Sequence, residues 1–169
     1  MDSSTLLFAV GLFLFLAGTI ALLLSRKNNR KTSETTSPVS AVSSQMQLQA
    51  YERMALLIDR IALPNLIARM SQSGISAREM QLLLTQTIRQ EFDYNITQQI
   101  YVSAEAWNAV KNLKEQNMLI INQNASTISA DATGLDLNKL LLEYLMTDQK
   151  GNLHELASQI ISFEAKKLL

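Results

Sequence analysis

The chain has 169 residues, equal numbers of basic and acidic side chains at 15 each, and no cysteine. This composition excludes disulfides and thiol chemistry, which agrees with a cytoplasmic location. From Met46 onward acidic residues slightly outnumber basic ones, so the chain lacks the basic face of a nucleic-acid-binding domain, and we expect no nucleic-acid partner.

The first predicted element is an uncharged apolar stretch from Leu6 to Leu24, LLFAVGLFLFLAGTIALLL. As a helix rising about 1.5 Å per residue it would measure roughly 28 Å, close to the hydrocarbon thickness of a bilayer. A secretory signal would have a basic segment before it and an Ala-x-Ala type cleavage site after it, and the sequence has neither. We therefore predict a retained transmembrane anchor over residues 1–25, with the lipid bilayer as its partner.

Basic residues directly after the predicted span indicate its orientation: Arg26, Lys27, Arg30 and Lys31. Positive charge close to a span prefers the cytoplasmic side. We expect a single-pass protein of the inner (plasma) membrane, with its N-terminus outside and its C-terminal domain in the cytoplasm. The same side chains would lie near anionic headgroups at the membrane surface.

Small residues within the span form a candidate helix-contact face in lipid: Gly11, Ala17, Gly18 and Ala21. Such residues let two membrane helices approach closely, which would allow a homo-oligomer. The favoured interpretation assigns this face no partner, because Gly and Ala are common in membrane helices and no strict Gly-x-x-x-Gly occurs.

Residues 26–45 form a predicted flexible linker, which is first basic and then rich in Ser and Thr with no apolar period. A segment of this composition cannot bury enough surface to order itself. It would let a cytoplasmic helical domain over residues 46–169 move roughly 25 Å from the membrane.

The predicted domain is all-α, a compact bundle of roughly five or six helices. A helix over 47–70 carries a broad apolar arc that includes Leu56, and Pro64 predicts a break because it lacks a donor and disfavours helical geometry at Leu63. Ser76 and Glu79 form a predicted capping box that opens the next helix. The core face expected of that helix comprises Met80, Leu83, Leu84, Thr87, Ile88 and Phe92.

The segment 96–102 has the period of a strand, because Tyr94, Ile96, Ile100 and Val102 fall on even positions, with Gln98 as an interruption. A single strand has no partner within a helical domain. We therefore interpret the segment as an extended connector, or as a strand edge that pairs with a second copy of the chain.

Ser103 is the predicted N-cap of a long helix that ends near Ile128. One rotation of this helix buries a coiled-coil-like seam in which two asparagines would have to be paired: Val110, Leu113, Asn117, Ile120, Asn124 and Ile128. The favoured rotation exposes both asparagines and buries instead Trp107, Val110, Ile121 and Ala125. Trp107 is then a core residue, with a partner contact as the alternative.

Two shorter helices complete the predicted bundle. Asp136 is the expected N-cap of the first, whose core face comprises Leu137, Leu140, Leu141, Tyr144 and Leu145. In the second, Asn152 and Glu155 would form another capping box. Its expected inner stripe comprises Leu153, Leu156, Ile160 and Phe163.

The sequence indicates no catalytic, cofactor or metal site. His154 is the only histidine, and no second His or Cys could complete a zinc site with it. The segment 131–136, DATGLD, superficially resembles a calcium loop but lacks the ligand alternation and the closing Glu. With only five glycines in the chain, two of them in the predicted span, a phosphate-cradling loop is not expected.

Several segments resemble an uncharacterised family of small bacterial membrane proteins with one N-terminal span: YERMALLIDRI, PNLIARM, IRQEFDYNITQQIYVS, EAW and DATGLDLNK. The resemblance covers Tyr51 to about Lys139. It implies the anchored architecture and a bacterial inner-membrane location. Since the family has no assigned activity, the resemblance implies no site residue.

These observations favour a membrane-tethered helical module, an adaptor or scaffold that binds another protein at the membrane and is not an enzyme. The alternative is an enzyme or small-ligand-binding domain whose pocket follows no known motif. A third, minor interpretation is a sensor of the membrane surface that uses the amphipathic C-terminal helix.

Overall fold

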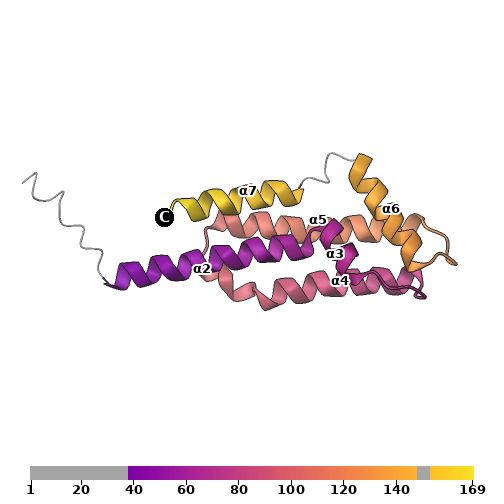
Figure 1. Cartoon of the computed structure of the whole chain (residues 1–169), viewed down its shortest axis with the longest axis horizontal. Helices are drawn as coiled ribbons and strands as arrows, with labels where there is room; N and C mark the ends of the chain where they lie inside the picture. The colour runs from indigo at the N-terminus through magenta and orange to yellow at the C-terminus, as the bar shows by residue number, and fades with distance from the viewer. Residues whose placement is uncertain (1–37, 148–152) are drawn as a thin grey trace, which may run out of the picture. The chain divides into compact units, whose positions relative to one another are not determined.

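The computed structural model describes residues 38–147 and 153–169, with side chains from Ser43 onward. Over these ranges the chain is helical (Figure 1), which confirms the predicted all-α class for the described part. The elements are α2 (Pro38–Ile61), α3 (Leu63–Met70), α4 (Ala77–Tyr94), the 3-10 helix η1 (Ile96–Ile100), α5 (Ala104–Thr127), α6 (Gly134–Thr147) and α7 (Leu153–Lys166).

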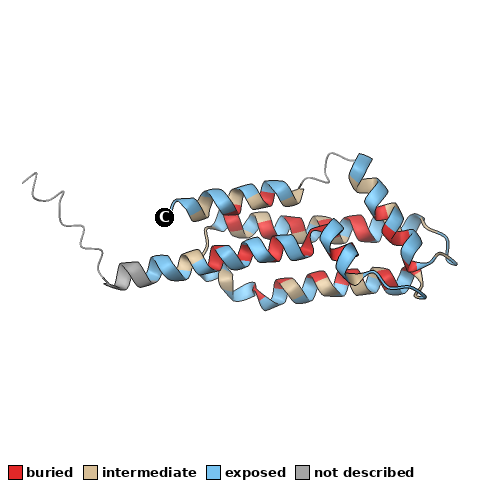
Figure 2. Ribbon diagram, viewed as in Figure 1, coloured by how far each residue is buried: buried red, intermediate tan, exposed pale blue. Residues whose placement is uncertain are grey.

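One hydrophobic core joins these helices, and Val42–Leu169 form one compact unit. Helix α4 packs against α5 and α6, and α5 also packs against α6 and α7. Figure 2 shows buried residues along the facing sides of the helices, with exposed residues on their outer sides. Large side chains that are almost fully buried include Met54, Ile58, Met80, Leu84, Ile88, Ile120, Ile121, Leu137 and Leu141.

Helix α2 begins at Pro38, inside the range that we expected to be a flexible linker. Proline suits the first position of a helix, because its φ is already helical and its missing donor would have no partner there. The remainder of the predicted linker lies outside the described residues.

The predicted break at Pro64 is confirmed. Helix α2 ends at Ile61, Ala62 has an extended ψ of 123°, and α3 begins with Pro64 in its first turn. A break leaves the last carbonyls of a helix without their usual donors. Three side chains donate to these backbone carbonyls. Asn65 Nδ2 donates to the Asp59 carbonyl at 3.2 Å, Arg69 Nη2 to the Arg60 carbonyl at 3.1 Å, and Asn117 Nδ2 to the Ile61 carbonyl at 2.7 Å.

The predicted start of α5 at Ser103 is confirmed, and one side chain of this helix contacts the break after α2. Our favoured rotation is wrong for Asn117, which is only 5% exposed. Its burial is tolerated because the Ile61 carbonyl accepts from its amide, so the polar group is not left unpaired. Asn124 is half-buried and donates to the Ile120 carbonyl of its own helix at 2.9 Å.

Two capping boxes lie side by side where α4 and α6 begin. Ser76 and Glu79 form the predicted box, and Thr133 and Asp136 form a second one with the Thr133 N–H donating to the Asp136 carboxylate at 2.9 Å. Asp136 is thus the acidic partner in the box, and Thr133 takes the N-cap place that we expected for Asp136. Backbone bonds join the two loops, from Ala77 N to Ala132 O at 2.9 Å and from Gly134 N to Ile75 O at 2.8 Å.

The extended segment predicted near 96–102 is wrong. Residues Ile96–Ile100 form η1, whose backbone bonds are local, with Gln98 N donating to Asn95 O and Tyr101 N to Gln98 O, both at 3.0 Å. The alternating apolar pattern cannot make a strand without a neighbouring strand to pair with. The even-numbered Ile96 and Ile100 are instead exposed, by 43% and 73%.

The predicted inner stripe of α7 is also wrong in part. Ala157 and Ile161 are buried, whereas Leu156 and Phe163 are 53% and 64% exposed. The buried residues Ala157 and Ile161 each lie one position after an expected one, so the helix is turned by about one residue from the predicted rotation. The expected cap at Asn152 lies outside the described residues.

Candidate functional site

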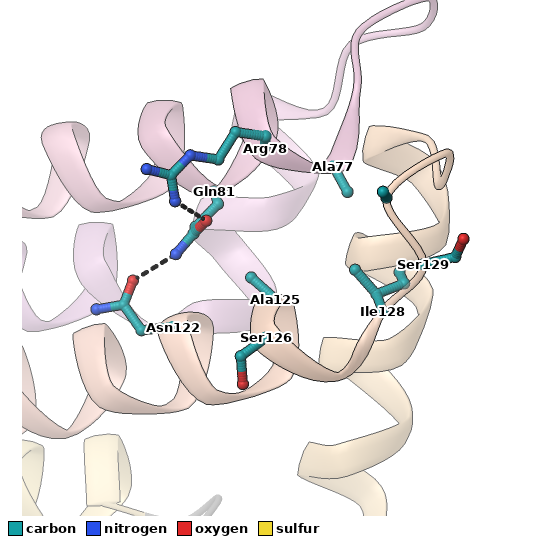
Figure 3. Close-up of a pocket in the computed structure, with 9 residues that line it drawn as sticks. Ala77, Arg78, Gln81, Asn122, Ala125, Ser126, Ile128 and Ser129 are labelled. Atoms are coloured by element: carbon teal, nitrogen blue, oxygen red, sulfur yellow. Dashed lines mark hydrogen bonds between the residues drawn. The ribbon is translucent and has the colours of Figure 1, made fainter.

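A polar cleft lies between the start of α4 and the end of α5 (Figure 3), with a volume of about 210 Å³. Arg78 Nη1 donates to Gln81 Oε1 at 2.8 Å, and Gln81 Nε2 donates to Asn122 Oδ1 at 2.8 Å. The remaining lining is small or aliphatic and comprises Ala77, Ala125, Ser126, Ile128, Ser129 and Ala130.

The polar groups of this cleft are largely engaged with one another. Both ends of the Gln81 amide are used, and Ser126 Oγ donates to the Gln123 carbonyl at 2.7 Å. The described lining residues include no His, Asp, Glu or Cys that could act as a general base. Arg78 and Asn122 have further N–H groups beyond these bonds, so the cleft can still bind hydrogen-bond acceptors, but its described lining supplies no catalytic set.

A second depression, the α2–α4 groove, is lined by Arg53, Leu56, Leu57, Arg60, Glu91, Tyr94 and Asn95, and has a volume of about 120 Å³. Its rim carries two large exposed side chains: Leu56 is 63% exposed and Tyr94 is 75% exposed. The groove thus combines apolar, aromatic and cationic surface in one place.

Helical spacing places these residues on facing sides of α2 and α4. Arg53, Leu56 and Arg60 follow one another at three and four residues along α2, so they share one side of the helix. Arg53 lies over the Tyr94 ring at 5.6 Å, and Arg60 contacts Glu91 at 2.7 Å. The two arginines therefore connect α2 to α4 at two points along the groove.

The end of the α2–α4 groove is fixed by Asn95, which is 7% exposed. Its Nδ2 donates to the Glu91 carbonyl at 2.8 Å, while its own backbone carbonyl accepts the first hydrogen bond of η1, from Gln98 N. Ile96 and Ile100 are the first and last residues of η1 and both are exposed. Exposed apolar residues therefore continue from Tyr94 into η1.

A third depression lies between α5 and α7, also about 120 Å³ in volume, and its lining is mostly aliphatic: Ala109, Asn112, Leu113, Leu153, Leu156, Ala157 and Ile160. It carries no charged side chain among the described residues. Leu156 and Ile160, which we expected inside the bundle, line this groove instead.

Trp107 has a position between our two expectations. It is half-buried, and its ring lies 5.0 Å from the Phe92 ring at an angle of 35°. Lys114 Nζ covers the same Phe92 ring at 4.6 Å. Trp107 therefore packs at the edge of the core, and it does not line the α2–α4 groove.

The membrane-related predictions lie outside the described residues. These comprise the span over 6–24, the topology residues Arg26, Lys27, Arg30 and Lys31, and the small-residue face of Gly11, Ala17, Gly18 and Ala21. Of the helices in 38–147 and 153–169, none is both long and apolar enough to cross a bilayer.

Metal-binding side chains do not gather in the described part of the chain, where no three of His, Cys, Asp and Glu lie close enough to share an ion. His154 lies beside a small cavity of about 10 Å³ that Asn117 also lines. The Asp136 carboxylate is engaged by Thr133, whose side chain and backbone lower the pKa of Asp136 below its usual value.

The α2–α4 groove is a feature that the sequence analysis did not identify. We assigned Leu56 to the apolar arc of α2 and Tyr94 to a strand pattern, and both are exposed. The width of the apolar arc of α2 gave no warning, because a broad arc is typical of a helix that other helices surround and so favoured burial of Leu56.

Comparison with known protein families gives a match over almost the whole chain. No curated protein and no solved structure matches the chain. The matching family model is described as a family of unknown function and covers residues 3–168, which is more of the chain than the resemblance over 51–139 that we noted. The chain therefore belongs to this family of unknown function, DUF7935.

Proposed function

We propose that the chain is a membrane-tethered helical interaction module, an adaptor or scaffold whose α2–α4 groove binds another protein at the cytoplasmic face of a bacterial inner membrane. One observation carries the proposal: Leu56 and Tyr94 stand exposed on either side of a groove that also presents two arginines. Tyr and Arg are the residue types that most often dominate binding energy at protein interfaces.

The size of the groove agrees with this role. A volume of about 120 Å³ can accept a side chain or two, but not a drug-sized ligand, for which pockets of roughly 300 Å³ or more are usual. Glu91 is the one acid among its described lining residues, and it is engaged by Arg60. The groove is therefore suited to contact and not to acid–base chemistry.

The predicted tether would hold the α2–α4 groove close to other membrane proteins. The groove is built partly from α2, the helix that begins at Pro38 shortly after the predicted span. Attachment to the membrane raises the effective concentration of the module near other membrane proteins, which strengthens weak contacts without adding new ones.

Affinity purification of the full chain from detergent-solubilised membranes tests the groove. We expect a partner that is recovered with the wild-type chain and lost with Leu56→Asp, because a charge at that position would have to be desolvated on binding. Leu82→Asp is the matched control, since Leu82 is also exposed on a helix, by 44%, but lies outside the groove. Equal recovery with all three chains would contradict the proposal.

The tether is tested separately. Replacing residues 6–24 with an unrelated span of the same orientation should preserve function, whereas releasing the domain from the membrane should weaken it. Full function of the released domain would favour an enzyme, and loss on the span replacement alone would assign a specific helix–helix contact in lipid to the small-residue face.

The proposed topology has a direct test in a chain without cysteine. Single cysteines at Ser4 and Ser44, labelled in intact cells with a reagent that does not cross membranes, should react only at position 4 if the N-terminus is outside. Labelling at position 44 alone would reverse the topology.

A second candidate function is small-ligand binding at the polar cleft. The connected side chains of Arg78, Gln81 and Asn122 favour it, because they present donors and acceptors around a volume of about 210 Å³. Arg78→Ala should abolish such binding and leave recovery of a protein partner unchanged, which separates the two functions.

A further inference from the structure

We propose that the segment entering the α2–α4 groove is acidic, with a large apolar side chain between two carboxylates. The inference rests on the proposed function and specifies the partner chemistry of the same groove. It follows from how the charges on the groove are compensated within the chain and from the distance between its two arginines, Arg53 and Arg60.

The negative charge in the groove is compensated within the chain. The Glu91 side chain is 15% exposed, and one of its oxygens contacts Arg60 at 2.7 Å and Arg69 at 3.7 Å. Two cations therefore share one carboxylate, which leaves excess positive charge beside it.

Arg53 adds a second source of positive charge. It lies over the Tyr94 ring at 5.6 Å, and no carboxylate of the described residues lies within ion-pair distance of it. The ring holds the guanidinium at the mouth of the groove but does not neutralise it. A partner carboxylate could pair with Arg53 without breaking an existing ion pair.

The positions of the two arginines set the spacing of the partner charges. Arg53 and Arg60 are seven residues apart on α2, which places them about 10.5 Å apart along the helix axis. Leu56 lies between them and is 63% exposed. A helical partner matches this surface when acidic residues at i and i+7 flank an apolar residue at i+3 or i+4.

The probe is a synthetic helical peptide with Glu at i and i+7 and Leu at i+3, against a peptide in which both Glu are replaced by Lys. Binding is measured to the full chain in phosphatidylcholine nanodiscs. We expect the acidic peptide to bind more tightly, and Arg53→Glu to weaken its binding by about ten-fold or more. Arg53→Glu should at the same time strengthen binding of the lysine peptide, which a loss of folding could not do.

Arg89→Glu is the matched control, because Arg89 is exposed on α4 but does not line the groove. It should leave the preference for the acidic peptide unchanged. Equal binding of both peptides, or equal effects of Arg53→Glu and Arg89→Glu, would overturn the inference.

Anionic lipid is the competing occupant. If phosphatidylglycerol in the nanodisc abolishes binding of the acidic peptide and Arg53→Glu no longer matters there, the groove faces headgroups and the peptide proposal fails. The proposed function fails differently, through partner recovery that is indifferent to Leu56→Asp. A partner that depends on Leu56 but shows no charge preference would refute only the inference on acidity.

Discussion

The two ends of α4 differ in how completely the rest of the chain bonds or covers them. At the first end, the capping boxes of Ser76 and Thr133 lie together and their loops share backbone bonds. At the other end, Tyr94 is 75% exposed and Ile100, in the following η1, is 73% exposed. The first end is closed by local and cross-loop bonds, whereas the second presents apolar surface that the described part of the chain leaves uncovered. The same helix thus serves stability at one end and, in our proposal, binding at the other.

The largest expected difference lies between a core residue near the closed end and a residue of the groove. Met80 is fully buried, so Met80→Ala should lower the free energy of unfolding by about 2–5 kcal/mol. Leu56→Ala should change it by no more than about 0.5 kcal/mol, because the side chain is 63% exposed. Chemical denaturation measures both. A loss above about 2 kcal/mol for Leu56→Ala would show that Leu56 is a structural residue.

Trp107 sharpens the comparison from the edge of the core. We expect Trp107→Ala to lower the free energy of unfolding by about 2 kcal/mol, less than the 3–5 kcal/mol usual for a fully buried ring, since the ring is half-buried against Phe92. Denaturation of the same full chain measures it. A loss below about 1 kcal/mol would move Trp107 to the partner-contact interpretation.

Gly134 tests how tightly the closed end is packed. A methyl group there would lie 3.0 Å from Ile75 Cγ1 and 3.1 Å from Met80 Cβ. Gly134→Ala should therefore lower the free energy of unfolding by about 1–3 kcal/mol through overpacking. Gly74→Ala is a useful contrast, because nothing lies near its added methyl group and the strain comes only from its φ of 83°. If Gly134→Ala proves neutral, the two loops are less closely packed than described.

The smallest expected effect is on the pH dependence of stability. Hydrogen bonds from Ser76 lower the pKa of Glu79, and hydrogen bonds from Thr133 lower that of Asp136. Because the folded-state pKa values are lowered, this stabilisation is present above the unfolded values of about 4.3 for Glu and 3.9 for Asp. It is lost as the pH falls through the lowered folded values.

Denaturation midpoints between neutral pH and about pH 3 check this expectation. The double variant of Glu79→Gln and Asp136→Asn keeps groups that can accept the same hydrogen bonds. Its stability should therefore fall less on acidification than that of the wild-type chain. Parallel curves for the two proteins would show that the capping carboxylates do not contribute.

Short-range features of the fold were predictable from the sequence. The capping box at Ser76, the N-cap at Ser103 and the break at Pro64 each depend on residues within four positions of one another, and all three are confirmed. Features that depend on distant partners were not. Asn117 is buried because of a carbonyl 56 residues away, which the helical period of α5 cannot show.

The candidate groove was missed for a similar reason. Leu56 and Tyr94 are apolar residues on different helices, and composition does not distinguish an apolar residue that neighbours cover from one that they leave exposed. The strand pattern from Tyr94 to Val102 had a further cause of error, because alternation describes side chains but not whether a neighbouring strand exists. Only the packing of α2 against α4 brings the groove residues together.

The central claim is that the α2–α4 groove holds a protein partner while the chain is attached to the membrane. A photo-crosslinking residue placed at position 56 of the full chain in intact cells tests it most directly, with position 82 as the exposed control. We predict a discrete protein adduct from position 56 that is absent from position 82, survives replacement of the span and weakens when the domain is released from the membrane. Adducts of equal yield from both positions, or none from position 56, would contradict the account.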